Sequence, residues 1–295
     1  MLENKLIFIY CRICQLCKYS TVANEMQRIS NNCRPKFTDE EVLTCYIWGV
    51  LSGKSSVKHA YHFIRDYWGG WFPLLPKYHA FNHRMNELCD VLPLILWLLM
   101  PTLPCAVPTI EHVLDSIPIV VANSRRSGTA RAASDVCDKG YCASKDMYYY
   151  GAKVHFLGML HPGSIPKPVA ACISRASESD ITVAKEWVDR SFAGFKIFAD
   201  KAYIDKDWRE TLKSEYNITV VTPVKLAKGQ RFLDAADELF SSVVSSIRQP
   251  IESIFNWINE KVNLQNASKV RSRKSLMVHV FGKLLAVCCE FAFNF

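Results

Sequence analysis

The sequence lacks internal repeats and low-complexity segments, and charged residues make up only 22% of its 295 positions. Apolar residues reach 49%, close to the average of folded soluble proteins, which excludes a disordered tail protein and a collagen-like fibre. No secretory signal is expected, because residues 1–9 carry Glu3 and Lys5 and no small-residue cleavage site follows. The length predicts a large core in about two domains, or in one large domain with additions.

Basic residues exceed acidic ones by 36 to 28, so the net charge of +8 fits a polyanionic partner without proving one. Most of the 12 cysteines lie in apolar stretches, which predicts free thiols in a reducing compartment and excludes a small disulfide scaffold. Cys11, Cys14 and Cys17 have a spacing found in iron–sulfur proteins, but the same spacing follows one helix face. We favour the helix over an iron–sulfur cluster, because no fourth ligand is obvious. A zinc site at Cys137 and Cys142 is less favoured still than the cluster.

Two apolar stretches are long enough to be mistaken for membrane spans. Val91–Ile110 contains no charged residue, but four prolines interrupt it, so we predict a buried helix at Leu94–Met100 and an extended connector. Leu276–Phe295 is also apolar, yet a histidine, a lysine and a glutamate are spaced through it. This pattern favours a buried helix, and a membrane protein is the weakest interpretation.

Residues 1–105 are predicted to be helical. A capping box at Thr38–Glu41 opens a helix that ends near Gly53, and further helices are expected over Val57–Tyr67 and His79–Leu88. Basic residues on these short helices are compatible with a helix-turn-helix-like DNA-binding unit. A plain helical bundle with a solvated basic face is an equally open alternative.

The pattern changes after residue 105, where segments rich in Val and Ile begin. Strands are expected over His112–Val121, Tyr148–Leu160, Pro168–Ser174, Lys196–Ala199 and Ile218–Val221, and helices over Asp180–Phe192, Trp208–Glu215 and residues 247–262. Three strands followed by alternating helices and strands are typical of a mixed-sheet α/β fold of the ribonuclease-H-like kind.

Three acidic residues stand out by their positions. Asp115 lies inside an apolar strand, Asp200 directly follows another strand, and Glu252 lies in the first turn of a helix. Charged side chains are rarely buried in strands unless they are paired or bind a metal. Carboxylate oxygens are the ligands that Mg²⁺ prefers, and two such ions can clamp a phosphodiester between them. The spacing therefore suggests a two-metal phosphodiester site.

A purely structural interpretation of the same three acids, without a metal, stays open. Asp115 could cap a turn before Pro118, Asp200 could pair with Lys201, and Glu252 could be a first-turn residue favoured by the helix dipole.

Around these acids the chain resembles bacterial insertion-sequence transposases of the DDE kind, from residue 114 almost to the C-terminus. Four segments carry the resemblance: LDSIPIVVANSRR (114–126), DKGYCASKDMYYYGAKVHFLGML (138–160), FADKAYID (198–205) and RQPIESIFNWINEKVNLQNASKVRSRKSL (248–276). Each segment alone is weakly diagnostic, but their order is specific. The similarity is weaker in the helical N-terminal part.

The resemblance implies a retroviral-integrase-like catalytic core over residues 106–295, with a basic helical C-terminal part, and a DNA-end-binding region over residues 1–105. It implies that Asp115, Asp200 and Glu252 bind two Mg²⁺ ions, which Mn²⁺ can replace. It also implies cleavage and strand transfer at the ends of an insertion sequence. The implied partners are terminal inverted repeats, target DNA and further copies of the chain, in the nucleoid of a bacterial cytoplasm.

Basic residues near these segments are predicted to contact DNA. They are Arg125, Arg126, Arg131, Lys153, Lys201, Arg248, Lys261, Lys269, Arg271, Arg273 and Lys274. Arg248 matches the arginine that similar families place one helical turn before the glutamate, whereas Ala202 replaces a usual glycine and Gln249 a second basic residue. Solvated basic faces remain the alternative for the two clusters.

Two further residues have open roles. Lys153 could pair with a core carboxylate instead of a phosphate, and Asp180 is either a helix N-cap or a supporting carboxylate of the site. Two rival functions also remain: an RNase-H-like nuclease without strand transfer, and a catalytically silent DNA-binding protein descended from a transposase.

Overall fold

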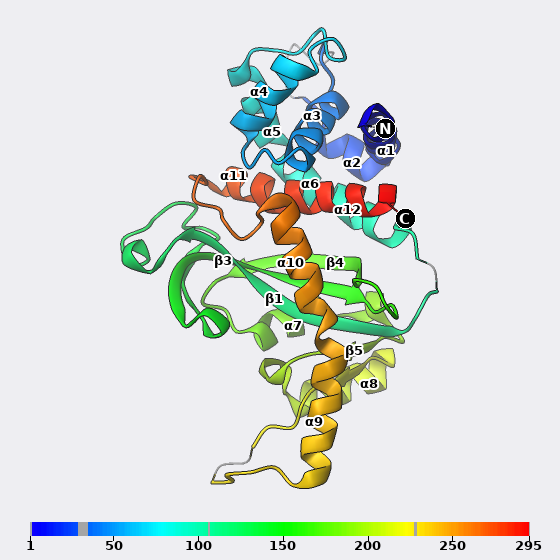
Figure 1. Ribbon diagram of the computed structural model, residues 1–295, viewed down its shortest axis with the longest axis vertical. Helices are drawn as coiled ribbons and strands as arrows, with labels where there is room; N and C mark the ends of the chain where they lie inside the picture. The colour runs from blue at the N-terminus through cyan, green and yellow to red at the C-terminus, as the bar shows by residue number, and fades with distance from the viewer. Residues whose placement is uncertain (1, 29–34, 106, 227–228, 295) are drawn as a thin grey trace. The chain divides into compact units, whose positions relative to one another are not determined.

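The computed structural model describes residues 2–28, 35–105, 107–226 and 229–294 (Figure 1). The chain divides into two compact units, each with its own internal contacts. A helical unit comprises Met1–Pro104, Arg131–Asp135 and Ile258–Phe295, and a sheet unit comprises Cys105–Ala130 and Val136–Trp257.

The helical unit is built from short helices that surround a shared apolar core. They are α1 (Leu2–Cys17), α2 (Ser20–Glu25), α3 (Asp39–Leu51), α4 (Val57–Tyr67), α5 (Tyr78–Glu87), α6 (Val91–Leu99), α11 (Arg273–Met277) and α12 (Lys283–Asn294). Residues 258–262, the last turn of α10, also belong to this unit. The N-terminal helices α3 and α6 pack against α12, so the two ends of the chain share one core.

The predicted capping box is confirmed at the start of α3. The Glu41 N–H donates to Thr38 Oγ1 over 3.3 Å, and the Thr38 N–H donates to Glu41 Oε2 over 2.7 Å. Two orphan amides of the first turn are thereby satisfied. Near the other end of α3, a Cβ on Gly49 would lie 2.4 Å from the Ala60 Cβ, so only glycine allows this close approach to α4.

The C-terminal apolar stretch forms the buried helix that its pattern predicts. Arg273–Asn294 and Tyr78–Thr102 are long and apolar enough to cross a membrane, but 83% and 50% of their most apolar windows are buried inside the protein. Lys283 is completely buried on α12, and its ammonium donates to the Asn263 carbonyl over 2.9 Å. These helices therefore serve as core elements of the helical unit.

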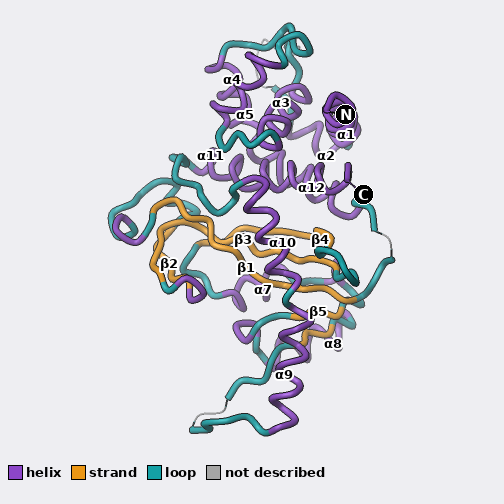
Figure 2. The backbone as a smooth tube through the Cα atoms, in the orientation of Figure 1, coloured by secondary structure: helices purple, strands orange, loops and turns teal. Residues whose placement is uncertain are grey.

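The sheet unit contains a mixed sheet (Figure 2). Its strands are β1 (Glu111–Ala122), β2 (Asp138–Cys142), β3 (Met147–Met159), β4 (Lys167–Arg175), β5 (Lys196–Phe198) and β6 (Thr219–Val221). Their order is β2-β3-β1-β5-β6, and β4 also pairs with β3. Pairings among β1 to β4 are antiparallel, whereas β5 is parallel to both β1 and β6. This is the α/β arrangement predicted from the sequence, consistent with an RNase-H-like core.

Helices cover both faces of this sheet. On one face, α7 (Asp180–Trp187) and α8 (Lys206–Tyr216) pack onto a cluster that includes Leu114 and Leu157. On the other face, α9 (Ala235–Arg248) and α10 (Pro250–Val262) run end to end across β1 and β5 (Figure 1). Proline is favoured at the first position of a helix, which explains why α10 begins at Pro250.

Two elements of the structure differ from those predicted from the sequence. Strand β2 was not predicted, and α9 begins at Ala235 rather than near residue 247. The outer part of α9 exposes Leu239, Phe240 and Val243, although its apolar residues recur at helical spacing and were an available signal for the helix. By contacts, residues 258–295 group with the N-terminal helices and not with the sheet. The functional roles assigned to residues 1–105 and 106–295 remain predictions.

Candidate functional site

The sheet register places Asp115 beside Asp200. The parallel pairs Glu111–Lys196 and Val113–Phe198 both join residues 85 positions apart, and the same offset joins Asp115 to Asp200. Strand β5 ends at Phe198, so the two aspartates lie just beyond the paired segment. Side chains alternate between the faces of a strand, so Asp115 points away from the face of Leu114 and toward α9 and α10.

The helix that carries Glu252 is attached to this point by residues on both sides of it. Arg248 donates from Nη2 to Asp115 Oδ2 over 2.9 Å, and their side chains are only 17% and 24% exposed. Phe255 packs edge-to-face on Phe156, and the centroids of the two rings lie 5.9 Å apart. Phe156 is the cross-strand neighbour of Asp115. Because residues three and four apart share a helix face, Glu252 lies on the side of α10 that faces Asp115.

Burial and mutual repulsion disfavour negative charge on both aspartates. Burial raises the pKa of Asp115 to about 6, although Arg248 and the Ser116 N–H act in the opposite direction. Burial also raises the pKa of Asp200, against the effects of the Ala202 N–H and Arg248. Asp180 contributes a further increase to both pKa values. The site is therefore short of positive charge, and a bound cation would relieve it.

Local contacts settle the alternatives that the sequence left open for these aspartates. Asp115 Oδ1 accepts from its neighbour Ser116 over 2.7 Å and does not close a turn at Pro118. Asp200 Oδ1 caps a short turn by accepting from the Ala202 N–H over 2.8 Å, and its described contacts do not include Lys201. Ala202 is not among the described residues with positive φ, so the turn accepts alanine in place of glycine.

Glu252, the third predicted metal ligand, does not lie close to Asp115 and Asp200. The Glu252 side chain is exposed, and within the described ranges no three Asp, Glu, His or Cys side chains lie close enough to hold one metal ion. The donor chemistry nevertheless fits a hard divalent cation, because two adjacent carboxylates offer more acceptor positions than their hydrogen bonds use. The buried Arg248 Nε, which has no hydrogen-bond partner in the described chain, could bind a phosphate oxygen beside them.

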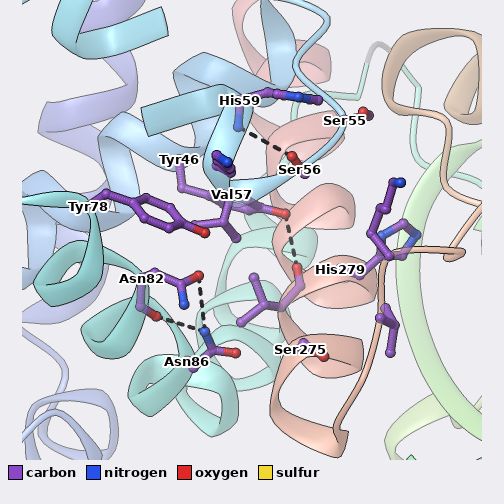
Figure 3. Close-up of a pocket in the computed structure, with 14 residues that line it drawn as sticks. Tyr46, Ser55, Ser56, Val57, His59, Tyr78, Asn82, Asn86, Ser275 and His279 are labelled. Carbon is purple, nitrogen blue, oxygen red and sulfur yellow. Dashed lines mark hydrogen bonds between the residues drawn. The ribbon is translucent and has the colours of Figure 1, made fainter. Parts of the chain in front are cut away.

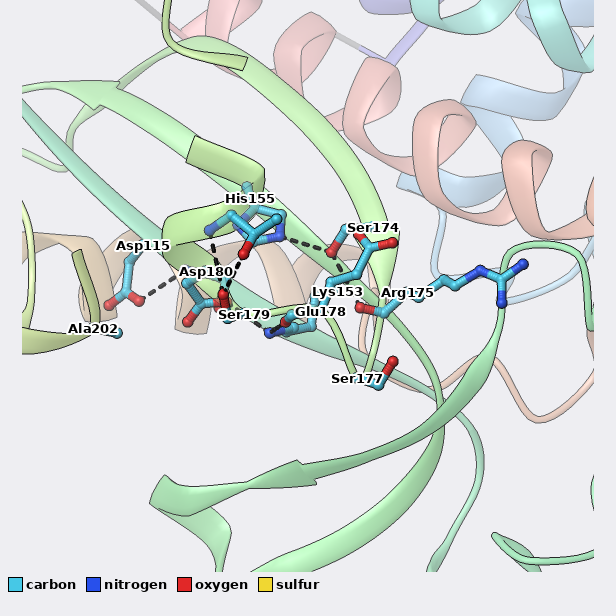
Figure 4. A network of polar contacts seen from close by, with 12 residues as sticks. Asp115, Lys153, His155, Ser174, Arg175, Ser177, Glu178, Ser179, Asp180 and Ala202 are labelled. Carbon is cyan, nitrogen blue, oxygen red and sulfur yellow. Dashed lines mark hydrogen bonds and ion pairs between the residues drawn. The ribbon is translucent and has the colours of Figure 1, made fainter. Parts of the chain in front are cut away.

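Lys153 contacts a carboxylate, as one of its two predicted roles required (Figure 4). Its ammonium donates to Asp180 Oδ1 over 2.7 Å and also to the Glu178 carbonyl. The N-cap prediction for Asp180 is wrong, because Ser179 caps α7 by accepting from the Thr182 N–H. Asp180 is instead the first residue of the helix, and its carboxylate is free to pair with Lys153.

His155 has a structural role in the sheet unit. It is 1% exposed, and its Nε2 lies 2.9 Å from Ser174 Oγ. Burial lowers the pKa of His155 to about 4, so the ring is neutral at physiological pH.

The other predicted DNA-contact residues differ in their surroundings. Arg125, Arg126, Arg131 and Lys201 are exposed. Arg273 pairs with Asp90 over 3.0 Å, and Lys274 pairs with Glu87 over 2.7 Å. Arg271 donates to backbone carbonyls, and Lys261 lies 3.7 Å from Glu290. Exposed ion pairs contribute little stability, so DNA phosphates could displace these acids at low cost.

The helical unit contains a cavity of about 420 Å³ between α3 to α5 and the C-terminal helices (Figure 3). Lys58, His59 and Lys269 line it together with Asn82 and Asn86. Of the described residues that line this cavity, none is acidic. Its surroundings therefore favour an anion over a cation.

The cysteine-rich segment forms a helix. Cys11, Cys14 and Cys17 lie on α1, where Cys11 is exposed and Cys17 is buried. The 11 described cysteines are free thiols, and Cys33 lies outside the described residues.

We expect the effect of Mg²⁺ on stability to depend on pH. A cation competes with the proton of Asp115, whose pKa of about 6 leaves the carboxylate charged only above that pH. Saturating Mg²⁺ should raise the melting temperature by about 2–4 °C near pH 7.5 and by much less near pH 5. Differential scanning fluorimetry would measure this, with Asp115→Asn as the control that lacks the difference. Equal shifts at both pH values would contradict the assignment.

Two residues of this site were missed by sequence reasoning. Phe255 anchors the helix of Glu252, and its helical distance from that residue was the available signal. Tyr203 is completely buried within the segment FADKAYID, and only its position three residues after Asp200 could have marked it.

Comparison with known protein families gives one match. The sequence profile of the family described as "Transposase DDE domain" matches residues 113–289, which is more than half of the chain and includes all three predicted acids. No significant match was found to a curated protein or to a solved structure.

Proposed function

We propose, since the chain belongs to the transposase DDE domain family, that it is the transposase of an insertion sequence. It would cleave phosphodiesters at the ends of the element and join the freed strands to target DNA. The observation that supports this best is that Asp115 and Asp200 lie side by side just beyond the parallel pairing of β1 with β5, where Arg248 ties the helix of Glu252 to Asp115.

Asp115, Asp200 and Glu252 would hold the divalent cations on which this family depends, two Mg²⁺ ions or Mn²⁺ in their place. When bound, such ions activate the attacking oxygen and neutralise charge on the leaving oxygen of a phosphodiester. The raised pKa values of both aspartates support a cation site there, because a bound cation would offset the cost of their buried charge, and Glu252 lies on the adjacent helix face.

The basic residues of the sheet unit would hold the DNA strand. Arg248 has one guanidinium nitrogen on Asp115 and a buried Nε without a described partner, so it can bind a phosphate without leaving the carboxylate. Arg125 and Arg126 follow β1, and Lys201 follows Asp200, all of them exposed. Such contacts would position the backbone and carry no sequence information.

Recognition of the DNA ends would be the role of the helical unit. Its cavity presents Lys58, His59 and Lys269 without an acidic residue among the described lining. The ion-paired Arg273 and Lys274 add exposed positive charge on the same unit. Contacts of this kind make binding strongly salt-dependent.

Two DNA ends must be brought together in transposition, so we expect the active form to be a homodimer or a larger assembly on DNA. The activity requires access to chromosomal DNA, which places the protein inside the cell, at the nucleoid of a bacterial cytoplasm.

Incubation of the purified protein with the DNA that flanks its own gene tests this function. With Mg²⁺ we expect nicks at matching inverted ends and joined products with target DNA, and with EDTA we expect neither. Asp200→Asn should lower the cleavage rate by about 10³-fold or more, because it removes ligand charge but keeps the oxygen that caps the turn. Asp207→Asn, an exposed carboxylate on α8, serves as the matched control.

The products separate the proposed function from its rivals. Cleavage without joined products would indicate a nuclease that lacks strand transfer. Salt-sensitive binding of the ends, with no cleavage in Mg²⁺ or Mn²⁺, would indicate a silent DNA-binding protein.

A further inference from the structure

A third acid lies near Asp115 and Asp200, on a different element from Glu252. Asp180 is the first residue of α7, and α7 packs against the short turn Lys201–Tyr203 that Asp200 caps. Its carboxylate is only partly exposed, at 20%, and Lys153 of β3 holds it over 2.7 Å. Figure 4 shows Lys153 in contact with Asp180, with Asp115 to one side of them.

Tyr203 gives independent evidence that these three acids lie in one neighbourhood. Its side chain is completely buried, and its hydroxyl has no hydrogen-bond partner among the described residues. Burial, and after it the charges of Asp180, Asp115 and Asp200 in that order, raise the pKa of the Tyr203 phenol well above its ordinary value. The hydroxyl therefore stays protonated and is a spare donor among the three carboxylates.

An unpartnered buried hydroxyl is costly, so its presence requires a reason. The neighbouring charges offer one, because Asp180 is the acid with the strongest effect on the phenol and is itself fixed by Lys153. The ion pair with the Lys153 ammonium favours the charged form of the Asp180 carboxylate and fixes its orientation. The ion pair with Lys153 keeps Asp180 deprotonated, and the phenol of Tyr203 stays neutral. Asp180 is therefore a fixed negative charge near Asp115 and Asp200.

We infer that Asp180, held by Lys153 near the buried Tyr203, is a positioning carboxylate that strengthens divalent-cation binding at Asp115 and Asp200. The inference rests on the proposed function and adds to it a residue that is neither one of the three predicted ligands nor a DNA contact. It also assigns Lys153 to the site's charge balance in place of a phosphate contact.

Titration of the full-length protein with Mn²⁺, followed by the electron paramagnetic resonance of free Mn²⁺, tests the inference without DNA or catalysis. Asp180→Asn should weaken Mn²⁺ binding by about tenfold, which corresponds to one lost favourable charge interaction. Asp205→Asn is the matched control, because Asp205 also lies at the start of a helix, as the N-cap of α8, and pairs with a lysine, Lys185, over 2.6 Å. It should change the Mn²⁺ affinity by less than about twofold.

Tyr203→Phe distinguishes a positioning role from a structural one. The substitution removes only a hydroxyl that has no described partner, so a purely structural residue should leave Mn²⁺ binding unchanged. We expect Mn²⁺ binding to weaken by about threefold while the melting temperature stays equal or rises. A variant that binds Mn²⁺ as tightly as the wild-type protein would overturn the role of the hydroxyl.

The double variant Asp180→Asn/Lys153→Met excludes a trivial explanation, in which the single variant merely exposes the charge of Lys153. We expect the double variant to bind Mn²⁺ weakly as well, and recovery of wild-type affinity would overturn the inference. Asp115→Asn separates this failure from that of the proposed function. If Asp115→Asn abolishes binding and Asp180→Asn does not weaken it, only the inference fails; if neither matters, the proposed metal site itself fails.

Discussion

The Asp115→Asn variant is expected to lose DNA cleavage by about 10³-fold or more and to be more stable than the wild-type protein. Burial raises the pKa of Asp115 from 3.8 to about 6, so the fold favours the neutral form of this side chain. Asparagine has nearly the same shape and no charge. It should raise the free energy of unfolding near pH 7 by about 2 kcal/mol, less than the full shift implies, because Arg248 loses its charged partner.

The sign follows from proton binding. Between pH 3.8 and about 6 the folded protein holds a proton on Asp115 that the unfolded chain has released, so wild-type stability falls as the pH rises through this range. Urea unfolding of both proteins at several pH values measures the effect, because other titrating groups cancel in the difference. The stability advantage of the variant should be small near pH 4 and largest above pH 6. A destabilised variant, or an advantage independent of pH, would contradict the prediction.

Gly151→Ala is expected to destabilise the sheet unit by about 3 kcal/mol or more. A Cβ at this position would lie 1.9 Å from the backbone oxygen of Ile119, so the strand itself would have to move. The register of β1 and β3 shifts beside this point, between Val120 and Ala122, and the glycine allows the strands to approach there. The same strand pair carries Asp115 and Lys153, so cleavage should fall together with stability.

Gly128→Ala is the matched control for this substitution. Gly128 belongs to the same unit, and an added Cβ would have no atom within 4 Å. Its unfolding free energy should differ from the wild-type value by no more than about 0.5 kcal/mol. Chemical denaturation compares the stability of the two variants. If Gly151→Ala were as stable as Gly128→Ala, β1 and β3 would be able to move apart at little cost, and the prediction would be wrong.

The sequence predicted most strands of the sheet because their apolar residues are continuous or alternate. The helix over Val57–Tyr67 was predicted with the bounds that the structure shows, because Ser56 caps it and glycines follow it. β2 was missed because Asp138–Cys142 contains only two apolar residues, and pairing with β3 stabilises it instead. Patterning reveals elements that bury a face, but not those held by a neighbour.

The candidate site was predictable to a similar degree. A charge inside the apolar strand around Asp115 was visible in the sequence, and so was the acid after the short strand before Asp200. The role of Asp180 depends on Lys153 and Tyr203, which are 27 and 23 positions away in opposite directions. Such a grouping depends on tertiary packing, and no local spacing encodes it. For Glu252, position on the helix could be predicted, but the orientation of an exposed side chain could not.

The parallel pairing of β1 with β5 also determines where this chain can accept changes of length. The two aspartates meet because their strands pair at a constant offset, so the number of residues in the connecting loops is free to vary. A loop insertion between the strands should leave the aspartates adjacent. Deletion of a single residue between Val113 and Asp115 would instead turn the carboxylate to the opposite face of the sheet. Divergence of related sequences should therefore concentrate as insertions and deletions in the loops, while these few strand positions tolerate neither.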